Sequence, residues 1–210
     1  MSTTAKKVAE HLLQIKAIKL QPTNPFTWAS GWKSPIYCDN RKTLSFPNVR
    51  DYIRDAFAEK IKAEYGDCDV VAGVATGAIA QGVLVAQVLN KPFVYIRSSA
   101  KAHGLENKIE GTIEAGQKVV VIEDLVSTGG SSLEAVAALR SAGCEVLGMA
   151  AIFTYGFQIA ADNFTNADCK LITLSDYNEM IDLALETGYI KAENVENLKE
   201  WRKDPVSWGK

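Results

Sequence analysis

The spacing of apolar residues changes along the chain. Near the N-terminus, after a Thr3 or Thr4 cap, a helix is predicted because Val8, Leu12 and Ile15 fall on one helical face. From residue 21 to residue 47, four prolines and several aromatic residues interrupt any helical pattern, so this stretch is predicted to form a non-helical hood of turns and short strands. Helical spacing returns after Pro47 and lasts until Gly66, with apolar residues every four positions: Val49, Ile53, Phe57 and Ile61.

Five later runs are almost continuously apolar and mostly β-branched, and segments of helical composition separate most of them. Such runs are typical of a parallel sheet that is covered on both faces. The predicted fold is α/β, a doubly wound, mainly parallel sheet of about five strands with helices on both faces and a small N-terminal hood. One domain spans 1–210, the hood takes in roughly 1–47 plus C-terminal contributions, and 191–203 is predicted to be a surface helix. The predicted strands are 69–75, 92–96, 118–122, 145–153 and 171–174.

The composition narrows the classes of function. A chain of 210 residues with 47% hydrophobic content can fill the core of one domain. A net charge of -2 argues against nucleic-acid binding through a general basic surface. Neither a signal-peptide pattern nor a bilayer-spanning apolar run is present in the sequence, so no membrane insertion is expected. The cysteines form no C-x-x-C pair and are expected to be reduced thiols of a cytoplasmic protein: Cys38, Cys68, Cys144 and Cys169.

Two adjacent acids, Glu123 and Asp124, follow an apolar run and precede a turn of serine, threonine and glycine. Burying an unpaired carboxylate is costly, so a ligand outside the strand is expected to use them. The turn can direct backbone N–H groups at one point, and a helix predicted over 131–139 adds its positive end, which together suit a phosphate. Carboxylates there accept hydrogen bonds from vicinal hydroxyls or hold a divalent cation. The pattern therefore favours a sugar phosphate over an ordinary capped turn, which leaves the acid pair unexplained.

The segment 97–111 is polar and glycine-bearing, and it supplies three potential cations, Arg97, Lys101 and His103. No apolar periodicity anchors it, so the composition indicates an anion-seeking loop. Taken alone, the segment is better interpreted as a solvated surface loop. Its interpretation as part of a site depends on the acid pair and the glycine turn.

The run VVVIEDLVSTGG resembles the signature with which type I phosphoribosyltransferases hold phosphoribosyl diphosphate (PRPP). Beside it, 97–111 is similar to the catalytic loop of the orotate phosphoribosyltransferase family. The segment FTWASGWKSPIYCDNR, 26–41, is similar to that family's hood over the base, and VAGVATGAIAQG, 71–82, to its pyrophosphate-side loop. Some members carry basic residues where this chain has Ala29, Gly77 and Ser98, which leaves a larger share of the anion binding to Lys33, Arg41, Lys101 and His103.

The resemblance implies transfer of the phosphoribosyl group of PRPP to orotate, giving orotidine 5′-monophosphate and pyrophosphate in pyrimidine biosynthesis. Mg²⁺ would be held mainly through PRPP and water. The resemblance implies catalytic roles for Lys101, His103 and Asp124, contact of Ser127 with orotate, and a homodimer with active sites shared between subunits. The PRPP-binding residues that it implies are Arg97, Lys101, His103, Glu123, Asp124, Leu125, Val126, Ser127, Thr128, Gly129, Gly130 and Ser131.

Two alternatives stay open at this point. A related transferase would use the same PRPP signature with a purine or uracil as acceptor. A PRPP-sensing regulator would keep the fold and bind a partner or RNA without catalysis. The lack of a basic stripe counts against RNA binding, and the cations of 97–111 count against a purely binding role.

Overall fold

The computed structural model describes residues 3–28, 31–97 and 108–209. Its helices are α1 (Thr3–Gln14), η1 (Asn40–Ser45), α2 (Pro47–Tyr65), α3 (Ile79–Leu89), α4 (Gly130–Ser141), α5 (Gln158–Asn166), α6 (Tyr177–Glu186), η2 (Ala192–Asn194) and α7 (Val195–Lys203), where η marks a 3₁₀-helix. Its strands are β1 (Ile18–Leu20), β2 (Phe26–Thr27), β3 (Lys33–Ser34), β4 (Ile36–Cys38), β5 (Val70–Val74), β6 (Phe93–Ile96), β7 (Ile109–Glu110), β8 (Lys118–Val126), β9 (Glu145–Thr154) and β10 (Leu171–Asp176).

A central sheet of six strands has the order β10-β9-β8-β5-β6-β7. Neighbouring strands from β10 to β6 are parallel, and β7 pairs antiparallel with β6. The predicted mainly parallel α/β sheet is confirmed, with one strand more than expected. The additional strand β7 is two residues long, so it leaves no apolar run from which a strand could be predicted.

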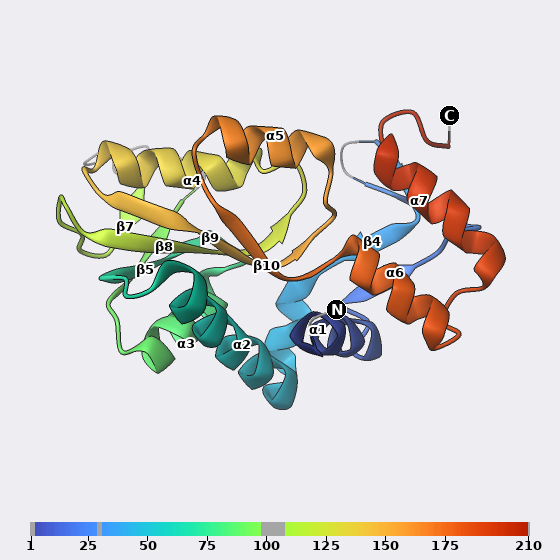
Figure 1. The fold of residues 1–210 in the computed structure, drawn as a ribbon, viewed down its shortest axis with the longest axis horizontal. Coiled ribbons are helices and arrows are strands. Elements are labelled where there is room, and N and C mark those ends of the chain that lie inside the picture. Colours follow the sequence, from blue (N-terminus) through green and yellow to red (C-terminus); the bar gives the residue numbers. More distant parts are fainter. Residues whose placement is uncertain (1–2, 29–30, 98–107, 210) are drawn as a thin grey trace.

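Helices cover both faces of the sheet: α4 and α5 lie on one face, and α2 and α3 on the other (Figure 1). The side chains of β8 alternate between these layers. Val119 and Val121 belong to the apolar cluster under α4 and α5, whereas Val120 and Ile122 belong to the cluster on the side of α2 and α3. Because each face is covered, the strand needs apolar residues in both positions of the alternation, which explains its continuous apolar run.

The order of the strands places a topological switch point between β5 and β8. From β5 the chain continues to β6 on one side, whereas β8, β9 and β10 follow on the other side. The connections after β5 and β8 therefore diverge, and in open α/β sheets ligands bind in the crevice outside the carboxyl ends of such strands. The fold thus brings the turn after β8 next to the turn after β5.

Strand β8 is longer than the sequence predicts. It ends at Val126 instead of residue 122, because pairing with β9 continues through Glu123 opposite Ala151 and Val126 opposite Thr154. The acid pair therefore lies inside the strand, near its carboxyl end, and not after it. A strand residue fixes its side chain more firmly than a loop residue, so both carboxylates have a defined direction.

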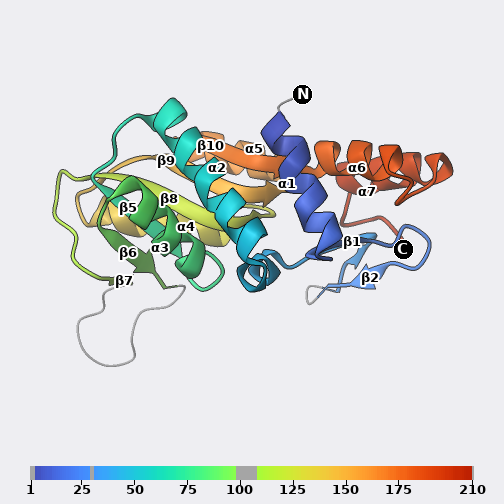
Figure 2. The same ribbon diagram turned by 90° about the horizontal axis from the view of Figure 1, so that it is seen from below.

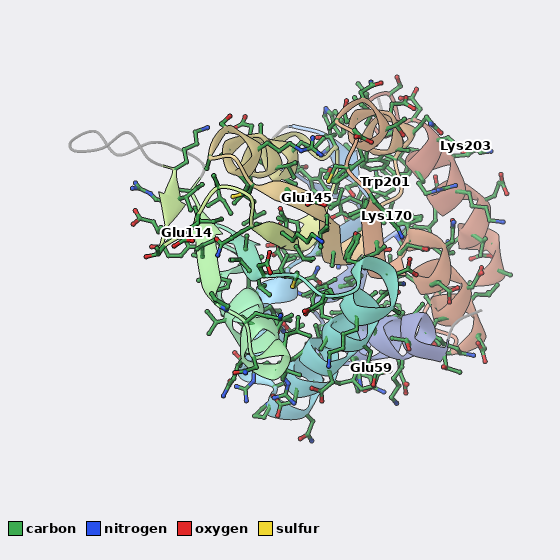
Figure 3. The ribbon with its side chains drawn as sticks, turned by 60° about the vertical axis from the view of Figure 1, so that its left-hand side comes forward. Glu59, Glu114, Glu145, Lys170, Trp201 and Lys203 are labelled. Carbon is green, nitrogen blue, oxygen red and sulfur yellow. The ribbon has the colours of Figure 1, made fainter. Side chains whose placement is uncertain are left out.

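The hood consists of two small antiparallel sheets, β1 with β4 and β2 with β3, at the end of the molecule where α6 and α7 lie (Figure 2). Helix α7 is a surface helix with one buried side: Trp201 is fully buried and points inward, whereas Lys203 is exposed (Figure 3). The Nε1 of Trp201 donates to the backbone oxygen of Lys33 at 3.2 Å. The C-terminal helix therefore holds the β2–β3 hairpin. Within the described ranges, no helix is both long and apolar enough to cross a membrane.

Candidate active site

A polar cavity of about 440 Å³ opens at the switch point between β5 and β8. Three segments form its walls: the turn after β5, the end of β8 with the start of α4, and the hood turn after β4. Its acids and its arginine face a space large enough for a sugar phosphate. The lining residues are Cys38, Asp39, Arg41, Val74, Ala75, Thr76, Gly77, Glu123, Asp124, Leu125 and Ser131.

Glu123 is a fixed, buried carboxylate at the back of this cavity. Only 6% of the residue is exposed. The Oγ of Ser132 donates to its Oε2 at 2.7 Å, and the backbone N–H of Asp124 donates to its Oε1 at 2.9 Å. Burial raises the pKa of Glu123 to about 8, and the adjacent negative charge of Asp124 acts in the same direction. The free protein therefore holds a carboxylate that a ligand with hydroxyl donors or positive charge would stabilise in its ionised form.

Asp124 lies half-buried in the same wall, and its position is set from two sides. The Nδ2 of the buried Asn40 donates to its backbone oxygen at 2.6 Å. The backbone of Gly77 lies against its side chain so closely that a Cβ on Gly77 would be 2.5 Å from the Cγ of Asp124. Burial raises the pKa of Asp124, while the charge of Arg41 lowers it. Asp124 thus presents its carboxylate at a place that only glycine at residue 77 leaves open.

The turn after β8 is a rigid connection into α4. Gly129 takes a left-handed conformation with φ of 83°, and a Cβ there would lie 2.7 Å from the ring of Phe164. The Nδ2 of Asn163 donates to the backbone oxygen of Thr128 at 2.9 Å. Helix α4 begins at Gly130, one residue before the predicted start, and its positive end faces the turn. The predicted phosphate cradle therefore has a fixed shape.

A second cavity of about 330 Å³ adjoins the first, since Cys38 and Leu125 line both. Three of its lining residues are aromatic, and the ring of Trp28 lies 5.3 Å from that of Tyr155. Flat apolar walls with a few hydroxyls suit a planar heterocycle. The residues that line this second cavity are Thr27, Trp28, Tyr37, Cys38, Leu125, Ser127 and Tyr155.

The structure brings together part of the predicted site. Of the predicted residues 123–131, Glu123, Asp124, Leu125 and Ser131 line the polar cavity, and Leu125 and Ser127 line the second. Val126 is fully buried, and its backbone oxygen accepts a hydrogen bond from the Oγ1 of Thr154 at 3.1 Å. The contacts of Thr128, Gly129 and Gly130 with PRPP stay predictions.

Of the three predicted cations of 97–111, the structure describes only Arg97. Its Nη1 lies 3.4 Å from the Oε1 of Glu110 on β7. Arg97 is not one of the described residues that line the two cavities. Lys101 and His103 lie outside the described residues, so their roles stay predictions from the sequence.

Tyr155 and Asn40 contribute to the site although neither was singled out from the sequence. Tyr155 follows β9 directly, and the rule that ligands bind beyond the carboxyl ends of parallel strands would have indicated it. Asn40 offers no such signal, because its contact with Asp124 spans 84 positions of the sequence. Gly77 was predicted as part of the pyrophosphate-side loop 71–82 and as the place of a missing basic residue, whereas the structure gives it a steric role beside Asp124.

The burial of Glu123 predicts a specific dependence of stability on pH. Its folded pKa is raised above the unfolded value, so its contribution to stability is complete below about pH 4.5 and is lost as the pH rises through about 8. The variant Glu123→Gln lacks this titration. We expect its free energy of unfolding, relative to the wild type, to increase between pH 5 and pH 8 in denaturant titrations. Parallel curves for the two proteins across this range would contradict the assignment.

The family of the chain follows from comparison with known proteins. The phosphoribosyl transferase domain model matches residues 43–186, more than half of the chain. The orotate phosphoribosyltransferase of Porphyromonas gingivalis is 62% identical over 209 residues, which cover 100% of both chains. That of Listeria monocytogenes serotype 4b is 58% identical over 205 residues, 98% of each chain.

Solved structures agree with this relationship. The orotate phosphoribosyltransferase from Aeropyrum pernix superposes with a TM-score of 0.76 at 26% identity, over 88% of this chain and 99% of that one. The Mycobacterium tuberculosis orotate phosphoribosyltransferase in complex with PRPP has a TM-score of 0.65 at 25% identity, over 87% of this chain and 99% of that one. With near-complete coverage of relatives about 60% identical to it, this chain belongs to the orotate phosphoribosyltransferase family.

Proposed function

We infer that this chain transfers the phosphoribosyl group of PRPP to orotate, giving orotidine 5′-monophosphate and pyrophosphate. The observation that carries this inference is the pair of adjoining cavities. The first is polar and contains the acid pair and the start of α4, and the second is flat and aromatic. They meet at Cys38 and Leu125, so a ribose in the first cavity and a base in the second would be joined at this boundary. Family membership makes orotate the expected base.

The polar cavity fits the donor part by part. Asp124 and Glu123 offer carboxylate oxygens to the vicinal hydroxyls of the ribose, which are hydrogen-bond donors. The turn 127–129 and the first N–H groups of α4 suit the 5′-phosphate, because the start of a helix carries unpaired donors and partial positive charge. Ser127 lines the base cavity, in agreement with the proposed contact of its side chain with orotate.

The residues of the site are suited to charge that develops during transfer. A ring N–H of orotate loses its proton to solvent, and this nitrogen forms the new bond to the anomeric carbon. The bond from that carbon to pyrophosphate breaks, and its electron pair leaves with pyrophosphate. Positive charge grows on the ribosyl ring as the leaving bond lengthens. The carboxylate of Asp124 lies in the cavity proposed for this ring and stabilises that charge. The negative charge on pyrophosphate is assigned, as a proposal, to Arg97, Lys101 and His103.

The acids of the site also fit Mg²⁺ as a helper of PRPP binding. Mg²⁺ prefers oxygen ligands and commonly binds through one or two carboxylates together with substrate phosphates and water. Asp124, with Glu123 behind it, supplies such oxygens at the cavity wall. Within the described residues, His, Cys, Asp and Glu form no cluster of three or more that could hold a metal without substrate. When bound with PRPP, the ion would neutralise phosphate charge.

We further propose a homodimer that packs through α3. This helix carries no charged residue over its whole length, and two of its valines are exposed, Val83 by 45% and Val88 by 42%. Helices that are apolar on all sides are normally covered. A two-fold interface would bury the same patch on both subunits. The turn at residues 75–78, which lines the polar cavity, leads directly into α3, so the interface would lie beside the site.

The dimer with shared sites predicts complementation between inactive variants. Val83→Glu is expected to produce monomers in sedimentation, because it would bury a charge in an apolar contact. Asp124→Asn and Lys101→Ala, each inactive alone, are expected to recover about a quarter of the wild-type activity when coexpressed, because half of the dimers then contain one intact site. Absence of any recovery in isolated mixed dimers would contradict sharing between subunits.

The experiment that tests the proposed function compares acceptors. The protein is mixed with PRPP and Mg²⁺ and with orotate, uracil or a purine, and release of pyrophosphate is measured. Turnover with orotate alone is the expected result, and turnover with another base instead would favour the related transferase. Tight PRPP binding without turnover of any base would favour the sensor.

The four free cysteines agree with the proposed cytoplasmic location.

A further inference from the structure

The second cavity, called the base cavity from here on, has no charged side chain among its described lining residues, although the proposed base is an anion. Orotate differs from a neutral pyrimidine such as uracil by one carboxylate, which is ionised at neutral pH. An anionic group gains affinity when it meets a cation or several strong donors. The described side chains that line the cavity are nevertheless all uncharged: Thr27, Trp28, Tyr37, Cys38, Leu125, Ser127 and Tyr155. A cation for the carboxylate would therefore come from just outside this described lining.

Lys33 is one hydrogen bond away from this lining. In the β2–β3 hairpin it is the register partner of Thr27, and its Nζ donates to the Oγ1 of Thr27 at 2.9 Å. Thr27 is exposed and lines the base cavity. A hydroxyl that accepts from an ammonium group keeps its own O–H to donate. Lys33 and Thr27 together can therefore present a charge and a donor to a carboxylate at the opening of the cavity.

The charge of Lys33 is available for such a ligand. Among the described residues, Lys33 forms no ion pair. Its backbone is nevertheless fixed, because its oxygen accepts the hydrogen bond from the buried indole of Trp201. The flexible stem of a lysine allows the ammonium group to move from the hydroxyl of Thr27 to a bound carboxylate without movement of the hairpin.

Other nearby cations are already occupied. Arg41 lines the polar cavity and pairs with Asp39, Nε to Oδ1, at 2.7 Å. Arg202 donates to the backbone oxygen of Gly156 at 3.3 Å, beside Tyr155, and does not itself line the base cavity. The hydrogen bond of Arg202 is to a backbone oxygen and not to a carboxylate, so Arg202 is the informative comparison.

We propose that Lys33, through Thr27, binds the carboxylate of orotate and makes the site select the anionic base. The proposal rests on the proposed function and extends it to the choice of acceptor. Lys33 acts on binding at the rim of the site, so it is a specificity residue. It takes no part in forming or breaking a bond.

The test compares two nucleotides that differ only by the carboxylate. Orotidine 5′-monophosphate carries it and uridine 5′-monophosphate lacks it, whereas the ribose and the 5′-phosphate are the same. Dissociation constants of both are measured by calorimetry for the wild type, Lys33→Met, Lys33→Arg and Arg202→Gln. We expect Lys33→Met to weaken the carboxylated nucleotide about tenfold, the size of one charge-assisted hydrogen bond, and to change the other by less than about twofold. Lys33→Arg keeps the charge and is expected to keep most of the preference.

The other outcomes overturn the proposal. Equal weakening of both nucleotides by Lys33→Met would mean that Lys33 only supports the hairpin. An unchanged preference in Lys33→Met, or a selective loss in Arg202→Gln, would place the carboxylate elsewhere. Failure of the proposed function is distinguishable, because it appears as a wild type that turns over no orotate with PRPP. A wild type that turns over orotate but has no preference between the two nucleotides overturns only the proposal for Lys33.

Discussion

Asp124→Asn is expected to lower kcat/KM for PRPP by at least about a hundredfold, since it removes one charged hydrogen-bond acceptor and the charge that stabilises the ribosyl ring in the transition state. The substitution keeps the size of the side chain. The hydrogen bond from Asn40 ends on the backbone oxygen of residue 124, so it is also kept. Steady-state kinetics with saturating orotate would measure the loss, and thermal unfolding would verify that the fold is unchanged.

The matched variant for this prediction is Glu123→Gln. Glu123 already accepts hydrogen bonds from the Oγ of Ser132 and from the backbone N–H of Asp124. Its carboxylate therefore has less capacity than that of Asp124 to accept hydrogen bonds from a ligand. We expect a smaller loss of kcat/KM than for Asp124→Asn. If the Asp124 variant kept activity within threefold of the wild type, the ribose would have to bind elsewhere than against this acid pair.

Gly77→Ala is expected to lower kcat/KM for PRPP by roughly tenfold or more, although it adds one methyl group far along the sequence from the acids. The new Cβ would lie 2.5 Å from the Cγ and 2.7 Å from the Oδ1 of Asp124, closer than real contacts allow. The short aspartate side chain must then rotate out of the cavity wall. Gly77 is not among the glycines with positive φ, so the substitution adds no backbone strain beyond this contact with Asp124.

A double-mutant cycle tests this cause. If Gly77→Ala acts by displacing the carboxylate of Asp124, the variant that combines it with Asp124→Asn should be little worse than Asp124→Asn alone. Fully additive losses would instead indicate a separate role of Gly77, such as direct contact of its backbone with the ligand. The free energy of unfolding of each variant serves as the control for general damage.

The sequence was sufficient for the sheet and for the acid pair, because both depend on local pattern. Continuous apolar runs predict strands that are buried on both faces, and β5, β8 and β9 follow this rule. The end of β8 was misplaced because Glu123 to Val126 are held in the strand by pairing with β9, and this pairing has no local signal. The start of the turn and of α4 was predicted to within one residue from its glycines.

The contacts that give the site its shape were less predictable, because they join residues far apart in the sequence. The contact of Asn40 with Asp124 and that of Gly77 with the same residue exist only after the hood and two strands have met. The pairing of Lys33 with Thr27, in contrast, lies within one hairpin. Its proposed role in binding the acceptor depends on the cavity that Thr27 lines, and the hairpin sequence does not predict that cavity. The chemistry of residues 101 and 103 stays a prediction from the sequence.

The hydrogen bond from Trp201 to Lys33 joins positions that are 168 residues apart. During synthesis the hairpin is therefore made 168 residues before the indole that holds it. Domains generally fold as units. The pocket for the acceptor base therefore stays incomplete until the growing chain has been extended to Trp201, 168 residues beyond the hairpin that it holds.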